Sequence, residues 1–403
     1  MINYFKNFIS PNKPDYYLLL TTSILIIIGI IFSYSLSMYI VWKKDFNEFH
    51  FLIRQFYAGM VGIIILFLFA HIKPEKLVPF ITWILFGFFS LIILSMKFLP
   101  ETITIQAGGA TRWIKLPGFS ISPVEFFKIG FIYYLAHSFN RRLNVNKKHT
   151  FFNETLLILP YGIIFFLIAI FVAIIQKELG QTLVIATIIF MMLIFANRSW
   201  KILSAIILLG ITAFISLIII FPHRIGRIQS WWGSVQDTVL SYLPSFFSDI
   251  LKISTYQEAY QVNHSINAIF NGNLLGEGIG NGFIKLGFLG EIHTDFVLAG
   301  IIEEIGFIGI FLIVLLFIFI ILRILKISKN TDNYIFHLFS IGIATMFGTS
   351  FLINSFGTSG IIPIKGLPIP FLSYGGSSLI ASCIAIGLVL SISNSINKDK
   401  KKI

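Results

Sequence analysis

Long apolar runs alternate with short polar connections along almost the whole chain. Runs of about 20 apolar residues are long enough to cross a bilayer as helices. The pattern therefore predicts an all-α polytopic membrane protein with about ten transmembrane helices, folded as a single membrane domain over residues 1–403. The runs fall near residues 16–41, 52–70, 77–98, 122–139, 152–175, 179–196, 202–221, 296–322, 334–357 and 374–393.

The composition excludes a water-soluble globular protein of this size, because 56% of the residues are hydrophobic and only 12% are charged. More than half of the 30 Lys and Arg residues lie in short loops and tails that share one side of the membrane if the N-terminus is inside. The positive-inside rule then predicts that both termini are cytoplasmic and that residues 222–295 form a large extracytoplasmic loop between helices 7 and 8. We therefore attribute the net charge of +12 to topology and to contact with anionic membrane lipids, and expect no nucleic-acid partner.

Two external segments are long enough to carry function, residues 99–121 and 222–295. Within the second, the spacing of apolar residues predicts an amphipathic helix near 256–270. This helix either covers the ends of the spans or guides a substrate. The Gly-rich stretch at 271–282 that follows can offer backbone N–H groups to a diphosphate.

A titratable cluster ends abruptly in the apolar run that begins at Phe296. Glu291, His293, Thr294 and Asp295 fall within five positions at the mouth of this span, where ionisable groups are costly and are functional candidates. Asp295 can act either as the N-cap of the helix or as a general base with a partly desolvated carboxylate. His293 either orients Asp295 or is an incidental surface histidine.

Five further charged residues lie in or beside apolar runs. Glu125 and Lys128 are about 60° apart on the expected fourth helix and can share a face. They either neutralise each other or bind a charged headgroup or diphosphate. Glu178 lies in an outer loop and is either a solvated turn residue or part of the same cavity. Glu303 and Glu304 do not line up with Asp295 on a helix, so we expect them to brace other helices.

Basic residues supply candidate anion sites outside the membrane. Arg112 and Lys115 flank Trp113, and this group is either an interfacial anchor or an anion site. Lys365 and Ser373 belong to a stretch containing Pro and Gly that leads into the last span. Glu291, His293 and these five residues complete the substrate-binding candidates together with Glu125, Lys128 and Glu178.

No ligand cluster with diagnostic spacing identifies a metal. The single cysteine, Cys383, lies in an apolar run, which rules out both an intrachain disulfide and a cysteine-ligated metal. A divalent cation such as Mg²⁺ or Mn²⁺ at Asp295 is left open, and no other cofactor is expected.

Several long motifs resemble the SEDS family of shape, elongation, division and sporulation proteins. The motifs are GGATRWI at 108–114, SPVEFFKI at 122–129, ELGQTLV at 178–184, GEGIGNGFIKLGFLGEIHTDFVLAGIIEEIGFIG at 276–309 and KGLPIPFLSYGGSS at 365–378. They occur in the family's order, and the last one is more similar to the cell-division branch than to the elongation branch.

The resemblance implies a peptidoglycan glycosyltransferase that polymerises lipid II on the outer face of the bacterial cytoplasmic membrane, at the division septum. It implies that the catalytic aspartate is Asp295, that the cavity residues are Glu125, Lys128 and Glu178, and that the characteristic tryptophan is Trp113. The implied partners are lipid II, the undecaprenyl-diphosphate-linked glycan, a class B penicillin-binding protein that crosslinks the product, and other membrane proteins of the divisome.

Two other functions remain open from the residues alone. A transporter that flips lipid II would use Glu125, Lys128, Glu303 and Glu304 as a polar pathway through the membrane. A scaffold that only recruits partners would leave the outer cluster unexplained and would tolerate Asp295→Asn. The elongation paralogue is the alternative within the same enzyme family.

Overall fold

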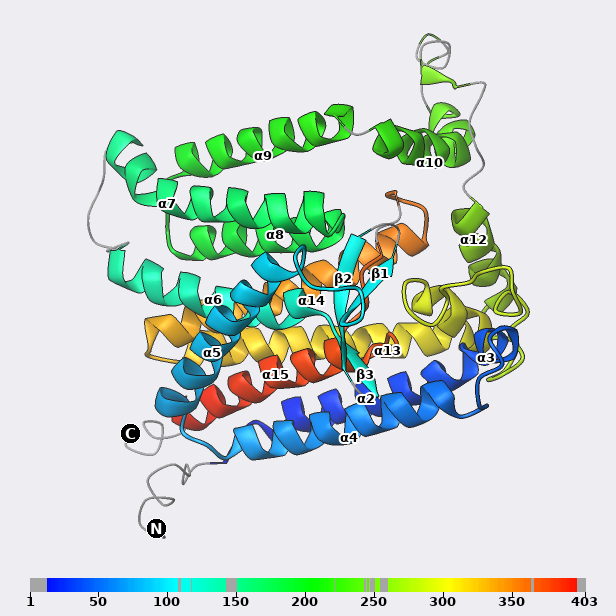
Figure 1. Ribbon diagram of the computed structural model, residues 1–403, viewed down its shortest axis with the longest axis horizontal. Coiled ribbons are helices and arrows are strands. Elements are labelled where there is room, and N and C mark those ends of the chain that lie inside the picture. Colours follow the sequence, from blue (N-terminus) through cyan, green and yellow to red (C-terminus); the bar gives the residue numbers. More distant parts are fainter. Residues whose placement is uncertain are drawn as a thin grey trace.

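The protein is a bundle of long helices (Figure 1). The computed structural model describes residues 13–107, 110–116, 118–142, 151–220, 222–242, 244, 246, 251–253, 260–363 and 366–396. Every predicted apolar run corresponds to a helix, so the helical polytopic class is confirmed. These helices are α2 (Tyr16–Ser35), α4 (His50–Ala70), α5 (Pro74–Ser95), α6 (Pro123–Arg142), α7 (Phe151–Ala169), α8 (Leu179–Phe195), α9 (Trp200–Ile220), α13 (Val297–Asn330), α14 (Tyr334–Thr358) and α15 (Gly376–Ile396).

Seven helices in the described part of the chain are long and apolar enough to cross a membrane. Six of them are α2, α4, α5, α13, α14 and α15. The seventh is the span Phe152–Ala173, which combines α7 with part of the π-helical turn η1 (Ile170–Ile175). Two shorter apolar helices, Leu179–Phe195 and Trp200–Thr212, accompany them. The protein is therefore a multi-pass membrane protein, while the count of ten spans stays a prediction.

Small residues allow α4 and α15 to pack closely. A Cβ atom at Gly62 of α4 would lie 2.6 Å from the Sγ atom of Cys383, and one at Gly387 of α15 would lie 3.0 Å from the Cβ atom of Phe69. Close approach at small residues is typical of helix pairs in membranes, where van der Waals packing replaces the hydrophobic effect as the source of association. The last helix is thereby fixed in the middle of the bundle.

Both described ends of the chain lie at the same end of the bundle (Figure 1). Arg323 of α13 forms an ion pair with Asp15 at 2.5 Å, and the N–H of Asp15 donates to the hydroxyl of Ser393 at 3.0 Å. Three helices that are distant in sequence are tied together here. The shared position of the termini agrees with the predicted topology.

A small antiparallel sheet, which the pattern of apolar runs did not predict, links α5 to α6. Strands β1 (Thr104–Ala107), β2 (Ala110–Leu116) and β3 (Phe119–Ile121) pair in the order β1-β2-β3. The stretch ATRWIKL of β2 is rich in β-formers such as Thr, Trp and Ile. The described part of the first segment predicted to be external thus forms a three-stranded sheet.

The described part of the large segment predicted to be external contains two helices, α10 (Pro222–Leu240) and α12 (Tyr260–Gly272). Helix α3 (Met38–Lys43) follows the end of α2. The predicted amphipathic helix is confirmed in α12 over its described residues. Its buried residues include Val262, Ser265 and Ala268, whereas the apolar side chain of Phe270 is 74% exposed.

Helix α13 is interrupted at Gly306, which has φ +69° and ψ −174°. The Gly-rich segment that follows α12 fills the interruption. The backbone N–H groups of Glu277 and Gly278 donate to the carbonyls of Glu303 and Glu304, each at 2.9 Å. On the other side of the break, the N–H of Phe307 donates to Asn273. Since carbonyls of α13 use two of the N–H groups that we expected to bind a diphosphate, that expectation is wrong for Glu277 and Gly278.

Candidate active site

Asp295 lies in the turn that leads from the external loop into α13. The N–H groups of Asp295 and Phe296 donate to the carbonyl of Glu291 at 3.0 and 3.3 Å. Helix α13 begins at Val297, and its N-cap is Phe296 without a side-chain capping bond. The N-cap role considered for Asp295 is therefore wrong. Its carboxylate forms no hydrogen bond or ion pair with the part of the chain that the structure describes.

Ser373 fastens the turn before α13 to the loop before α15. Its hydroxyl donates to the carbonyl of Thr294 at 2.7 Å and accepts from the N–H of Ile369 at 2.9 Å. The side chain of Gln55, from α4, donates to the carbonyl of Ser373 and accepts from the N–H of Gly375. Ser373 is buried and its hydroxyl is engaged by the backbone, so in this structure it holds the two segments together.

Asn354 of α14 holds the backbone of Asp295. Its amide donates to the carbonyls of Asp295 and Leu367 at 2.8 and 2.6 Å, and its side-chain oxygen accepts from Thr358 at 3.2 Å. Gly366 lies directly against the carboxylate, since a Cβ atom there would be 2.5 Å from Oδ2 of Asp295. The carboxylate is thus placed by backbone bonds and by the absence of a side chain at residue 366.

His293 is buried, so its interpretation as a surface histidine is wrong. Its ring lies edge-on to Phe51, with centroids 5.2 Å apart, and 5.6 Å from the ring of Tyr374. Burial is the main cause that lowers the pKa of His293 to about 4, so the ring is neutral at pH 7. Glu291 is exposed, and its carboxylate accepts a hydrogen bond from Thr294.

Arg112 of β2 reaches toward the N-terminus of α8. Its Nε atom lies 3.5 Å from Oε1 of Glu178 and donates to the carbonyl of Gln176 at 3.1 Å. Side chains alternate between the two faces of a strand, so Trp113 and Lys115 share the face opposite to Arg112. Lys115 is exposed and Trp113 is partly buried. The three residues grouped in the sequence are therefore divided, and only Arg112 pairs with Glu178.

Burial raises the pKa values of two carboxyl groups in this region. It is the main cause that raises the pKa of Asp295 to about 6, with Glu291 raising it further and Arg112 lowering it. It also raises the pKa of Glu178 to about 7, against the attraction of Arg112. Carboxylates with pKa values near the working pH are suited to acid and base catalysis.

Glu125 and Lys128 form the intramembrane pair that their spacing predicted. The Nζ atom of Lys128 lies 2.9 Å from Glu125 and donates to the side-chain oxygen of Gln181 at 2.8 Å. The amide of Gln181 donates in turn to Glu125 at 2.5 Å. The neutralising role of the pair is confirmed, and its role in binding a substrate stays a prediction.

A polar cavity of about 10 Å³ adjoins this triad, large enough for one water molecule. Ser350, Ser378 and Ser382 line it together with Leu367 and Pro368. Consecutive residues of one stretch therefore contact both places, Gly366 the carboxylate of Asp295 and Leu367 and Pro368 the cavity.

Two residues that organise this region, Gln181 and Asn354, are not among the site residues predicted from the sequence. Both are amides within apolar runs, and the rule that polar residues in spans are functional candidates would have selected them. Lys365 lies outside the described residues. Within the described residues no group of three His, Cys, Asp or Glu side chains is placed to hold a metal ion.

Residues 16–398 match the model of a protein family described as "Cell cycle protein", which covers FtsW, RodA and SpoVE. The chain belongs to this family. It is 42% identical to the probable peptidoglycan glycosyltransferase FtsW of Helicobacter pylori, over 94% of this chain and 98% of that one. It is 30% identical to the protein of the same name from Geobacter metallireducens, over 97% and 98% of the two chains. The resemblance to SEDS proteins is confirmed.

Two solved structures share the fold of this family member. One comes from a study of polymerization and crosslinking by a peptidoglycan synthase complex. It is 22% identical, with a TM-score of 0.66 over 96% of this chain and 99% of that chain. The other is the rod shape determining protein RodA of Thermus thermophilus, also 22% identical, with a TM-score of 0.62 over 96% and 98% of the two chains.

Proposed function

We propose that this protein is a peptidoglycan glycosyltransferase that polymerises lipid II into glycan strands at the outer face of the cytoplasmic membrane. Membership of the family and the names of its relatives support the reaction class. The assignment of Asp295 as the base depends on the surroundings of its carboxylate. This carboxylate is desolvated, has no hydrogen bond to the described residues and lies in the turn that ends the external loop.

The reaction needs one base and positive charge, and no covalent nucleophile. A sugar hydroxyl of the acceptor bonds to the anomeric carbon of the donor, and the bond from that carbon to the diphosphate oxygen breaks. The hydroxyl proton passes to Asp295. The departing diphosphate takes both electrons of the broken bond, and a cationic side chain beside it stabilises the charge.

The candidate cations are not equivalent in the structure. Lys128 is buried and already neutralised by Glu125, whereas Lys115 is exposed. Arg112 is paired with Glu178, whose pKa of about 7 means that a proton neutralises this carboxylate in part of the molecules at neutral pH. Protonation of Glu178 would release the charge of Arg112 for a diphosphate. Lys365 completes the set of candidates.

The carboxylate of Asp295 is a suitable ligand for a divalent cation. Mg²⁺ is commonly held by one or two carboxylates together with substrate phosphates, and the carboxylate of Asp295 forms no hydrogen bond or ion pair with the described residues. Such an ion would neutralise the charge of the diphosphates.

The cell-division branch of the family is the one we assign. The relatives above are named FtsW, which supports a septal role beside a class B penicillin-binding protein and other membrane proteins of the divisome. The elongation role remains the alternative within the family. A lipid II transporter is disfavoured, because Glu125 lies in a compact triad whereas Glu304 pairs with Lys285 in a separate cluster.

The test compares wild type with Asp295→Asn, purified in detergent with the cognate class B partner, using labelled lipid II and a gel that resolves glycan chains. We expect the variant to fold and to bind the partner. Its polymerisation should be at least about 100-fold slower than that of the wild type, because it lacks the base. Asp237→Asn is the matched control, an exposed aspartate of the same external segment, and should keep wild-type activity. Wild-type polymerisation by Asp295→Asn would refute the role of Asp295. Movement of lipid II across liposomes without polymer would favour the transporter.

A further inference from the structure

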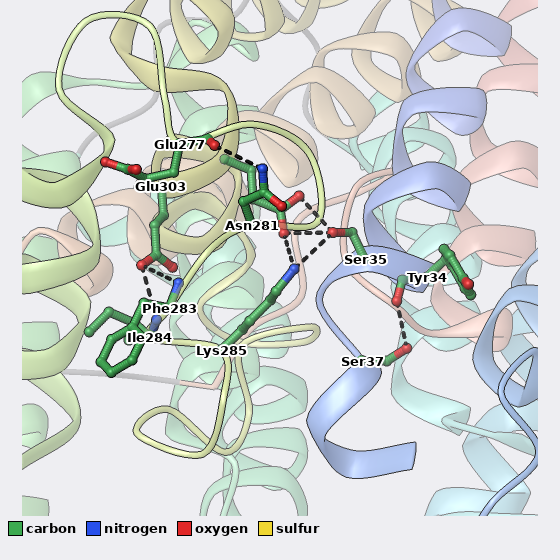
Figure 2. Close-up of polar contacts among 10 residues, drawn as sticks. Tyr34, Ser35, Ser37, Glu277, Asn281, Phe283, Ile284, Lys285 and Glu303 are labelled. Carbon is green, nitrogen blue, oxygen red and sulfur yellow. Dashed lines mark hydrogen bonds and ion pairs between the residues drawn. The ribbon is translucent and has the colours of Figure 1, made fainter. Parts of the chain in front are cut away.

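A buried ion pair lies apart from the residues that the reaction uses. The Nζ atom of Lys285 lies 2.7 Å from Oε1 of Glu304, and the side chains are only 2% and 0% exposed. The hydroxyl of Ser35, at the end of α2, donates to both oxygens of Glu304, at 2.6 and 2.7 Å, and accepts from Lys285 at 3.3 Å. Figure 2 shows the ammonium group of Lys285 directed at this cluster.

Stability alone does not account for this cluster. Replacing a buried ion pair by apolar residues of similar volume is often neutral or stabilising, because desolvation offsets much of the attraction between the charges. A buried pair does, however, fix one arrangement of the segments that carry it, since any other arrangement leaves a charge buried without a partner. The position of the pair in the chain is therefore informative.

The pair closes a short loop that has Asp295 at its centre. Lys285 precedes Asp295 in the external loop, and Glu304 follows it in the first part of α13. The neighbouring Glu303 strengthens the closure, because its Oε1 atom accepts from the N–H groups of Phe283 and Ile284, each at 2.9 Å (Figure 2). Residues 283–285, at the start of the loop, are thus held against Glu303 and Glu304 of α13, just before its break.

Helix α2 supports both segments that place the carboxylate. Ser35 binds the pair, and Gly29 packs against Phe371 of the loop before α15, where a Cβ atom at residue 29 would lie 2.0 Å from the carbonyl oxygen of Phe371. Leu36, directly after Ser35, packs against Gly300 of α13, where a Cβ atom would lie 2.6 Å from a methyl carbon of Leu36. Helix α2 therefore resists a displacement of the loop before Asp295, and it also supports the loop before α15.

We propose that Lys285, Glu304 and Ser35 are positioning residues, which fix the loop that carries Asp295 and so hold the catalytic carboxylate against Gly366. The inference rests on the proposed glycosyltransferase function. The three residues do not touch the reacting atoms. Their effect passes through the backbone of residues 286–296, and its measure is the turnover of bound substrate.

The test measures polymerisation kinetics with the class B partner and, separately, amide hydrogen exchange of residues 286–296 without substrate. The variants are Lys285→Met, the double variant Lys285→Met with Glu304→Met, the conservative Lys285→Arg, and Ser35→Ala. Arg323→Met is the matched control, because Arg323 forms an ion pair at the opposite end of the same helix. Folded protein is quantified by size-exclusion chromatography and thermal unfolding.

We expect Lys285→Met and the double variant to lose about tenfold or more in kcat with little change in KM, since small misplacements of catalytic groups cost up to about 100-fold. Exchange of residues 286–296 should accelerate in both. Lys285→Arg should recover most of the activity, Ser35→Ala should show a smaller loss in the same direction, and Arg323→Met should match wild type.

The proposal is overturned if the folded double variant, or folded Ser35→Ala where the double variant does not fold, keeps wild-type kcat and wild-type exchange. It is also overturned if Arg323→Met loses as much kcat as Lys285→Met, because the effect would then follow any weakening of α13. Absence of polymer with the wild-type protein would count against the glycosyltransferase function, while the exchange data would still report on the positioning of the loop.

Discussion

The carboxylate of Asp295 is placed by a neighbour that has no side chain. A Cβ atom at Gly366 would lie 2.5 Å from Oδ2 of Asp295, so Gly366→Ala must displace the carboxylate or the loop. We expect this variant to fold and to polymerise about 100-fold more slowly. Gly375→Ala, in the same loop, is the control, because its Cβ atom would meet its nearest neighbour at 3.6 Å. Equal activities of the two variants in the lipid II assay would contradict this account of the site.

The pH dependence of polymerisation should report the ionisation of Asp295. A general base acts in its ionised form, so the rate should fall as the pH falls through about 6, the pKa that burial gives this group. Glu291 raises that pKa and Arg112 lowers it. The acidic limb should therefore move to lower pH in Glu291→Gln and to higher pH in Arg112→Gln. Rate profiles from pH 5 to 8 measure these limbs, and shifts in the opposite directions would exclude Asp295 as the titrating group.

Local spacing in the sequence was sufficient to predict the pair Glu125 and Lys128, because residues three positions apart on a helix share a face. It could not predict that Gln181 completes the group or that Asn354 supports Asp295, since these bonds join residues more than 50 positions apart. Such contacts depend on which helices pack together, and hydropathy does not encode that.

Among the elements, the interrupted helix α13 depends on glycine at the break. Gly276 has φ +80°, and a Cβ atom there would lie 2.3 Å from the carbonyl oxygen of Glu304. Gly280 has φ +90°, but a Cβ atom there would meet nothing within 4 Å. Gly276→Ala and Gly280→Ala share the backbone strain, and only the first adds a clash. We expect the thermal unfolding midpoint of Gly276→Ala to be lower than that of Gly280→Ala by roughly 2 °C or more, and equal midpoints would argue against the inserted segment.

Hydropathy predicted the helices well, because each must present an apolar surface over its whole length. It did not predict the break at Gly306, since the residues on both sides are apolar and the missing backbone bonds are supplied by residues 273–278. Nor did it predict the three-stranded sheet, because short strands at a membrane surface give only a few alternating positions.

For the whole molecule, the distribution of basic residues and the shared position of the termini predict one orientation in the membrane. The chain has a single cysteine, Cys383, which is buried, so Cys383→Ala provides a background for labelling. Tyr242 of the external segment is 86% exposed, and Trp200, the first residue of α9, is 78% exposed. In spheroplasts, a membrane-impermeant maleimide should label Tyr242→Cys at once and Trp200→Cys only after permeabilisation. The reverse pattern would place Asp295 on the cytoplasmic side, where a polymerase of the outer face cannot work.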